Sequence, residues 1–152
     1  MTNAKDRLRL WLRLLKVTRG IEARLREALR LEFETTLPRF DMMAALSRHP
    51  EGLKMSALSG VLRVSNGNVT GIVDRLSAEG LTERMPVPGD RRAMMVRLTT
   101  DGQAEFARQA EAHEGWVDEL LGDFTADEAR TLATRLMQLA EKQDKKEMTN
   151  AL

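Results

Sequence analysis

Apolar residues between positions 5 and 32 recur every three or four positions, which predicts one long amphipathic helix. The residues on its apolar face are Leu10, Leu14, Val17, Ile21, Leu25 and Ala28. A helix of about 28 residues spans roughly 42 Å. Because that length exceeds what one small core can cover, we expect part of the apolar face to pack against a second chain.

Three shorter helices are predicted between Pro38 and Gly80. Pro38 suits the first turn of the first helix, and Ser65 is a good N-cap for the third. Gly80 stands where a left-handed C-cap would end that third helix. The apolar positions that define the three helices are Phe40, Met43, Ala44 and Leu46, then Leu58, Val61 and Leu62, then Val69, Ile72, Val73 and Leu76.

After Gly80 the apolar period changes to two, which predicts a β-hairpin. Residues 81–84 and 94–98 have the pattern of short strands. Two prolines followed by a glycine mark the segment 85–92 as the hairpin loop. The tip of this loop carries the adjacent arginines Arg91 and Arg92.

Two capping boxes predict two further helices in the last third of the chain. The first box is Thr100 with Gln103, and the second is Thr125 with Glu128. The residues expected to face inward are Phe106, Ala110, His113, Val117 and Leu120, then Ala129, Leu132, Leu136 and Leu139. The polar tail at 141–152 is expected to fray.

The composition, with 42% apolar and 31% charged residues in 152, suits one folded domain. The absence of cysteine excludes a disulfide framework, a thiolate zinc site, a catalytic cysteine and a cysteine-based redox sensor. No run of 18 apolar residues is present, so we expect no transmembrane helix. The first 16 residues keep arginines within the apolar pattern, unlike a signal peptide. We therefore expect a cytoplasmic protein that does not contact a membrane.

The net charge of +1 conceals an uneven distribution. Residues 1–53 carry 11 basic and 7 acidic side chains, a net of +4, and residues 54–100 carry 7 and 4, a net of +3. Residues 101–152 carry 6 basic and 12 acidic side chains, a net of −6. This asymmetry favours one face that meets a polyanion. A solvated helical surface with scattered charges explains it equally well.

Two short helices joined by a tight turn and followed by a basic hairpin predict a winged helix-turn-helix, within a mainly α-helical chain. Such a fold needs small and polar residues at the start of its second helix, because they reach base edges and phosphates in the major groove. That end reads Ser65-Asn66-Gly67-Asn68-Val69-Thr70-Gly71. Asparagine pairs with adenine, and the helix dipole attracts phosphate. In the alternative interpretation, residues 65–68 are only a turn and the helix begins at Val69.

The two arginines at the tip of the wing suit the negative potential of a narrow minor groove. We expect one of Arg91 and Arg92 to reach DNA and the other to form a salt bridge with Asp90. The sequence does not distinguish the two. In the alternative interpretation, both are solvated surface charges or only pair with Asp90.

The segment 53–102 resembles the MarR family of multiple antibiotic resistance regulators. The matching residues are Leu58, Leu62, Ser65, Val69, Thr70, Val73, Asp74, Arg75, Leu76, Gly80, Leu81, Arg84, Asp90, Arg91, Arg92, Val96, Leu98, Thr99 and Gly102. Lys54 stands where the family often has a capping threonine. Gly71 stands where many members have arginine, which puts base contact by that position in doubt. The residues expected to face DNA are Ser65, Asn66, Gly67, Asn68, Thr70, Gly71, Arg75, Arg84, Arg91 and Arg92.

The resemblance implies a homodimer. Residues 1–34 and 100–152 would form its helical dimerisation region, and residues 35–99 the winged DNA-binding domain. The two recognition helices would lie about 34–36 Å apart, on successive major grooves of a palindromic double-stranded operator. Repression is the direction of control that the family implies.

Members of the family are commonly released from DNA by small ligands, often aromatic acids, bound between the dimerisation helices and the winged domain. The candidates to line such a pocket are Trp11, Leu14, Phe33, Leu37, Arg39, Phe40, Met43, His113 and Trp116. A place in the core is the alternative for each. The segments 35–41 and 65–71 resemble the branch that senses hydroxycinnamoyl-CoA and other aryl-CoA thioesters. The cations available for the phosphates of such a ligand are Arg13, Arg19, Arg24, Arg26, Arg39 and Arg48.

Two rival classes were weighed against this interpretation. An enzyme would need a nucleophile, a base and an orienting group, or a metal site. The chain has only two histidines, His49 and His113, which are far apart in the sequence, and no tyrosine. We therefore expect no catalytic residue, metal or cofactor. A DNA-binding regulator without any effector remains the other alternative, and a fully packed junction beside the winged domain would favour it.

Overall fold

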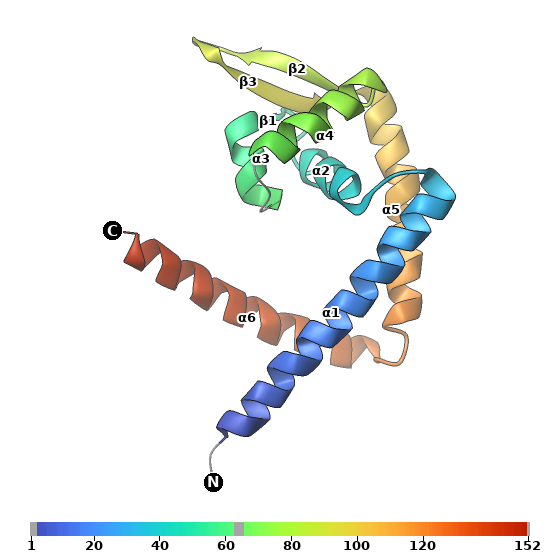
Figure 1. Cartoon of the computed structure of the whole chain (residues 1–152), viewed down its shortest axis with the longest axis vertical. Coiled ribbons are helices and arrows are strands. Elements are labelled where there is room, and N and C mark those ends of the chain that lie inside the picture. Colours follow the sequence, from blue (N-terminus) through green and yellow to red (C-terminus); the bar gives the residue numbers. More distant parts are fainter. Residues whose placement is uncertain (1–2, 63–65, 152) are drawn as a thin grey trace. The chain divides into compact units, whose positions relative to one another are not determined.

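The computed structural model describes residues 3–62 and 66–151. The chain is mainly helical and carries one small antiparallel sheet, as the sequence predicted. Figure 1 shows its elements in chain order: α1 (Ala4–Phe33), α2 (Leu37–Ser47), β1 (Leu53–Lys54), α3 (Met55–Leu62), α4 (Asn66–Ala78), β2 (Thr82–Val87), β3 (Asp90–Leu98), α5 (Thr100–Leu120) and α6 (Ala126–Asn150). They form two compact units, Met1–Trp116 and Val117–Leu152.

The first unit is built around a core of side chains from α2, α3, α4 and β3. Its fully or nearly fully buried members are Met42, Met43, Leu46, Leu58, Val69, Val73, Leu76, Val96 and Leu98. A second cluster joins Leu29 near the end of α1 to Leu37 and Phe40 of α2, with Phe106 of α5 packed against it. The winged helix elements are therefore anchored to both flanking helices. The division of the chain into dimerisation and DNA-binding regions concerns function and stays a prediction.

The long helix α1 is continuous and buries only its C-terminal part. Leu25 and Leu29 are buried, whereas Leu10 and Val17 are 58% and 54% exposed. The apolar face predicted from the sequence is therefore covered at one end and open at the other. This distribution agrees with the expectation that part of the face packs on another molecule.

The sheet has the strand order β1-β3-β2, with both pairings antiparallel. Leu53 of β1 pairs with Val96, and Arg84 of β2 pairs with Val96 from the other side. Sequence reasoning missed β1, because two residues carry no periodic signal. It also predicted strands that are too short: the pairing continues from Thr82 to Val87, past Pro86, with a register shift between Pro86 and Val87. The region predicted as a loop is thus largely strand.

Short-range hydrogen bonds join the wing to the helices on either side of it. Gly80 has φ +76° and ends α4 as predicted. The N–H groups of Gly80 and Leu81 bond to the carbonyls of Ser77 and Leu76 at 3.0 and 2.9 Å, the pattern of a Schellman cap. The cap that opens α5 is Thr99 and not Thr100, because its hydroxyl accepts the N–H of Gly102 at 3.0 Å.

The second unit consists mainly of α6. The predicted capping box is confirmed, since Thr125 and Glu128 exchange hydrogen bonds at 3.1 Å in both directions. The helix continues to Asn150, so the expectation of a frayed tail from residue 141 is wrong. No residue of α6 is buried within this chain, so Leu132, Leu136 and Leu139 do not face an intrachain core as predicted. None of the helices in the described part of the chain is long and apolar enough to cross a membrane.

Candidate nucleic-acid interface and adjoining pocket

The helix α4 begins at Asn66, which rules out the alternative in which the helix starts only at Val69. Val69 and Val73 point into the core with 1% and 0% exposure. Asn68, Thr70 and Gly71 lie on the exposed side of the first two turns. The predicted polar surface therefore exists on one side of this helix. Ser65 and the side chains at 66 and 67 lie outside the described residues.

Gly71 leaves open space on the exposed side of α4. A Cβ added at this position would meet nothing within 4 Å, so the fold itself does not require glycine there. A glycine in a helix interior costs roughly 1 kcal/mol relative to alanine. The position therefore admits close approach of another molecule to the backbone of α4.

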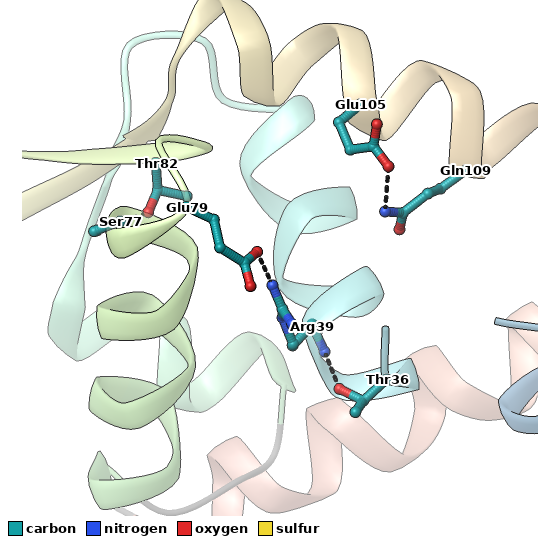
Figure 2. A network of polar contacts seen from close by, with 7 residues as sticks. All are labelled: Thr36, Arg39, Ser77, Glu79, Thr82, Glu105 and Gln109. Carbon is teal, nitrogen blue, oxygen red and sulfur yellow. Dashed lines mark hydrogen bonds and ion pairs between the residues drawn. The ribbon is translucent and has the colours of Figure 1, made fainter. Parts of the chain in front are cut away.

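Two ion pairs attach α4 to its neighbours. Asp74 pairs with Arg84 of β2, and Glu79 pairs with Arg39 of α2. Figure 2 shows the second link, with the backbone N–H of Arg39 also donating to the hydroxyl of Thr36, the N-cap of α2. Arg84 was predicted to face DNA, and the structure ties its guanidinium to Asp74 within the chain. Its main contribution is therefore to hold α4 and the wing together.

The wing tip carries Arg91 and Arg92 in exposed positions. Asp90 accepts a hydrogen bond from the backbone N–H of Arg92 at 3.0 Å. The predicted salt bridge is wrong, because Asp90 makes no ion pair with either arginine within the described residues. Its carboxylate shapes the turn instead, and both guanidinium groups remain available at the tip. Further along β3, Arg97 is paired across the strands with Glu83.

A cavity of about 730 Å³ lies beside α4, between its exposed flank and the junction of α1 with α2. Its lining residues are Arg26, Arg30, Thr35, Thr36, Leu37, Pro38, Arg39, Asn68, Gly71, Ile72 and Arg75. Four of these are arginines, and none carries a carboxylate. The buried Nε of Arg39 has no hydrogen-bond partner within the described residues. The chemistry of this lining suits an anion with an apolar body.

The predicted pocket set is only partly brought together. Leu37 and Arg39 line the cavity, and Arg26 was expected as a cation. Met43 is fully buried in the main core, and Trp11 is exposed on the N-terminal part of α1. Sequence reasoning missed Arg30, Thr35, Thr36, Pro38 and Ile72 as lining residues, and it assigned Asn68, Gly71 and Arg75 to DNA alone. Nothing in the local sequence signals that α4 forms a wall of this cavity.

The remaining predicted pocket residues belong to an aromatic cluster. His113 of α5 stacks on Phe40 at 4.5 Å between ring centroids, and Trp116 meets Phe33 edge to face at 6.2 Å. Burial lowers the pKa of His113, against the attraction of Asp41. Burial also raises the pKa of Asp41. This cluster packs α1, α2 and α5 together and offers no open space of its own among the cavities described above.

The comparisons with known proteins agree on one family. Residues 35–94 match the MarR family. The HTH-type transcriptional regulator PecS of Dickeya dadantii is 31% identical over 107 residues, which cover 69% of this chain and 64% of PecS. The chain spans about half to two thirds of the length of the curated relatives that it matches.

Solved structures extend the likeness to nearly the whole chain. A MarR family transcriptional regulator from Silicibacter pomeroyi matches with a TM-score of 0.76 and 31% identity, over 94% of this chain and 99% of that one. A mutant of MarR from E. coli, complexed with operator DNA, matches with a TM-score of 0.75 and 27% identity over 91% and 99%. PecS and the Silicibacter protein are named as transcriptional regulators and not as enzymes. With the same winged helix core and the same flanking helices, this chain is a member of the MarR family.

Proposed function

We propose that the protein is a sequence-specific DNA-binding transcriptional regulator that acts as a repressor. The observation that carries this proposal is the pairing of the exposed first turns of α4 with an exposed arginine tip on the wing. Asn68 and Thr70 offer the amide and hydroxyl groups that read base edges or bind phosphate. The E. coli MarR structure solved with operator DNA has the same fold, which supports the proposal.

The wing extends this interface. Arg91 and Arg92 are exposed and carry no ion pair within the described residues, so their charge is available to a nucleic acid. A hairpin arginine gains from the negative potential of a narrow minor groove. Because phosphate contacts release counterions, the wing is expected to contribute to the salt dependence of binding.

The functional unit is proposed to be a homodimer. The N-terminal part of α1 and the whole of α6 expose apolar side chains that a monomer leaves in water, among them Leu10, Val17, Leu132 and Leu136. Contiguous apolar surface of this kind marks an interaction site. Two winged units related by a two-fold axis would read the two half-sites of a palindrome.

The regulator is proposed to respond to a small anionic effector, an aromatic acid or an aryl-CoA thioester. The cavity beside α4 supports this, since its arginines Arg26, Arg30, Arg39 and Arg75 suit a carboxylate or phosphate. An effector releases DNA only if it binds more tightly to a conformation that fits DNA poorly. A regulator without effector is the second candidate, and the open cavity favours the first.

Fluorescence anisotropy on labelled DNA from upstream of the gene tests the DNA-binding role at fixed salt. Asn68→Ala should lower specific affinity by about 1–3 kcal/mol. Replacing Arg91 and Arg92 together with alanine should weaken binding and flatten its salt dependence. Arg97→Ala is the matched control, because Arg97 lies on the same strand but pairs with Glu83. Unchanged operator binding by the first two variants would refute this interface.

The effector is tested in the same assay. Aromatic acids and their CoA thioesters are added in turn to the protein–DNA complex, and release by one of them identifies the effector class. The variant Arg26→Gln should then need a higher concentration of that compound. Release of DNA by none of them, together with intact operator binding, would favour the regulator without effector.

A further inference from the structure

A methionine pair lies at the base of the wing, in a chain that has no cysteine. Met85 of β2 is directly opposite Met95 of β3. Residues opposite each other in an antiparallel pair share one face of the sheet. Val96, the neighbour of Met95, points into the core, so the alternation of side chains puts this pair on the face that turns away from the core.

The pair is packed against a strained backbone position. Gly52 has φ +102°, and a Cβ there would lie 3.4 Å from the methyl group of Met85 and 3.5 Å from that of Met95. Both side chains are half-buried. On the other side of Met95, Lys54 of β1 is its partner in the sheet. The two thioethers therefore join all three strands at one level.

This level is the last regular one before the tip. The next pairing towards the tip joins Pro86 to Met94, and the register shifts immediately afterwards. Proline donates no hydrogen bond to the ladder. The arginine tip is thus attached to the domain through a weakened ladder, which makes packing at the Met85–Met95 level important for its position.

We infer that Met85 and Met95 form an oxidation-sensitive site that lets peroxides weaken DNA binding, an inference that rests on the proposed role of the wing. A thioether sulfur attacks one oxygen of a hydroperoxide, and the O–O bond breaks. The sulfur keeps that oxygen as a sulfoxide and is oxidised by two electrons. The departing oxygen takes up the proton and leaves as water or, from an alkyl hydroperoxide, as an alcohol.

The product no longer suits its surroundings. A sulfoxide is polar and chiral, and it disrupts apolar packing of the kind that methionine provides. Here it would replace the contacts over Gly52 that hold β2 and β3 to β1. The wing would then lose a defined position relative to α4, and DNA binding would have to restore it. We expect about a fivefold rise in Kd for the operator, since ordering of the wing opposes binding.

The other methionines supply controls. Met42 and Met43 are fully buried and should remain reduced, whereas Met137 and Met148 of α6 are 56% and 71% exposed and should oxidise readily. The variant Met137→Leu/Met148→Leu therefore removes the most exposed sulfurs outside the wing. The variant Met85→Leu/Met95→Leu removes the proposed site and keeps similar apolar volume. Its melting temperature and its operator affinity before oxidation show whether the wing still folds.

The experiment treats the purified full chain with hydrogen peroxide, maps sulfoxides by peptide mass spectrometry and measures operator binding by anisotropy. The wild type and Met137→Leu/Met148→Leu should lose affinity equally, and Met85→Leu/Met95→Leu should keep it. Methionine sulfoxide reductases should restore the wild type. Full affinity despite sulfoxide at both wing positions would overturn the inference, as would equal loss in Met85→Leu/Met95→Leu.

Hydrogen exchange separates this inference from the proposed function. If the reduced protein fails to bind any operator, the DNA-binding proposal fails while the oxidation site is still testable. Oxidation should then speed amide exchange in β2 and β3 of the wild type and leave the leucine variant unchanged. Unchanged exchange in the oxidised wild type would refute the site on its own.

Discussion

The contact between Gly102 and the end of α4 is the most sharply defined constraint in the fold. A Cβ at this position would lie 1.9 Å from the carbonyl oxygen of Leu81, a backbone atom that cannot rotate away. Gly102→Ala must therefore displace the start of α5 from the segment that links α4 to β2. The same segment sets the position of the wing, so the displacement reaches the proposed interface.

The cost follows from the bonds at this junction. The N–H of Thr99 donates to Leu81 at 3.0 Å, its hydroxyl donates to Gly80 at 2.6 Å, and that hydroxyl accepts from Gly102 at 3.0 Å. Loss of two or three such bonds costs about 1 kcal/mol each, and overpacking adds about 1–3 kcal/mol. Alanine returns at most about 1 kcal/mol through its better helix propensity. We expect a net loss of about 2–4 kcal/mol in the free energy of unfolding.

Urea-induced unfolding at fixed protein concentration measures this loss, because the stability of an oligomer depends on concentration. Gly115→Ala is the matched control in the same helix, since a Cβ there meets nothing within 4 Å. It should stabilise the protein by about 0.5–1 kcal/mol. If Gly102→Ala is as stable as the wild type, or shifts in the same direction as Gly115→Ala, the reasoning is wrong.

Three further predictions concern the cap, the aromatic cluster and the dimer. Gly80→Ala should cost about 1–2 kcal/mol in thermal unfolding, because φ is +76°; an unchanged melting temperature would contradict it. Burial holds the pKa of His113 below its ordinary value of 6.5, so the unfolded chain binds the proton more tightly. The free energy of unfolding should therefore fall as the pH drops below 6.5, and His113→Gln should remove this slope. The raised pKa of Asp41 acts in the opposite sense, because its protonation favours the folded state as the pH falls towards its ordinary value of 3.8. Ile21→Asp should yield monomers or aggregates in light scattering after gel filtration, whereas Lys16→Asp, at an exposed position of the same helix, should remain dimeric. A dimeric Ile21→Asp would refute the role of α1.

Features that depend on neighbouring residues were predictable. The long helix was expected at 5–32 and runs from Ala4 to Phe33. The cap at Gly80 and the capping box at Thr125 also have the expected form. Each of these depends on hydrogen bonds and periodicity within a few residues, and such signals are carried by the local sequence.

Features that depend on distant residues were not. The strand β1 exists because residues 53–54 meet β3 some forty positions later. Asp90 turned out to bond to a backbone N–H and Arg84 to Asp74, because the geometry of the hairpin and of α4 selects among several carboxylates. Thr99 displaced Thr100 as the cap of α5 through its bond to Gly80.

The same distinction applies to the candidate site. Sequence alone established the order of the helices, the polar start of α4 and the basic hairpin, since composition and period at each position define them. Tertiary structure determined that four arginines from three helices line one cavity, and that Asn68, Gly71 and Arg75 belong both to this cavity and to the proposed DNA-binding helix. The relation between effector and DNA depends on this shared wall. It arises from the packing of α1 and α2 beside α4, which no local pattern encodes.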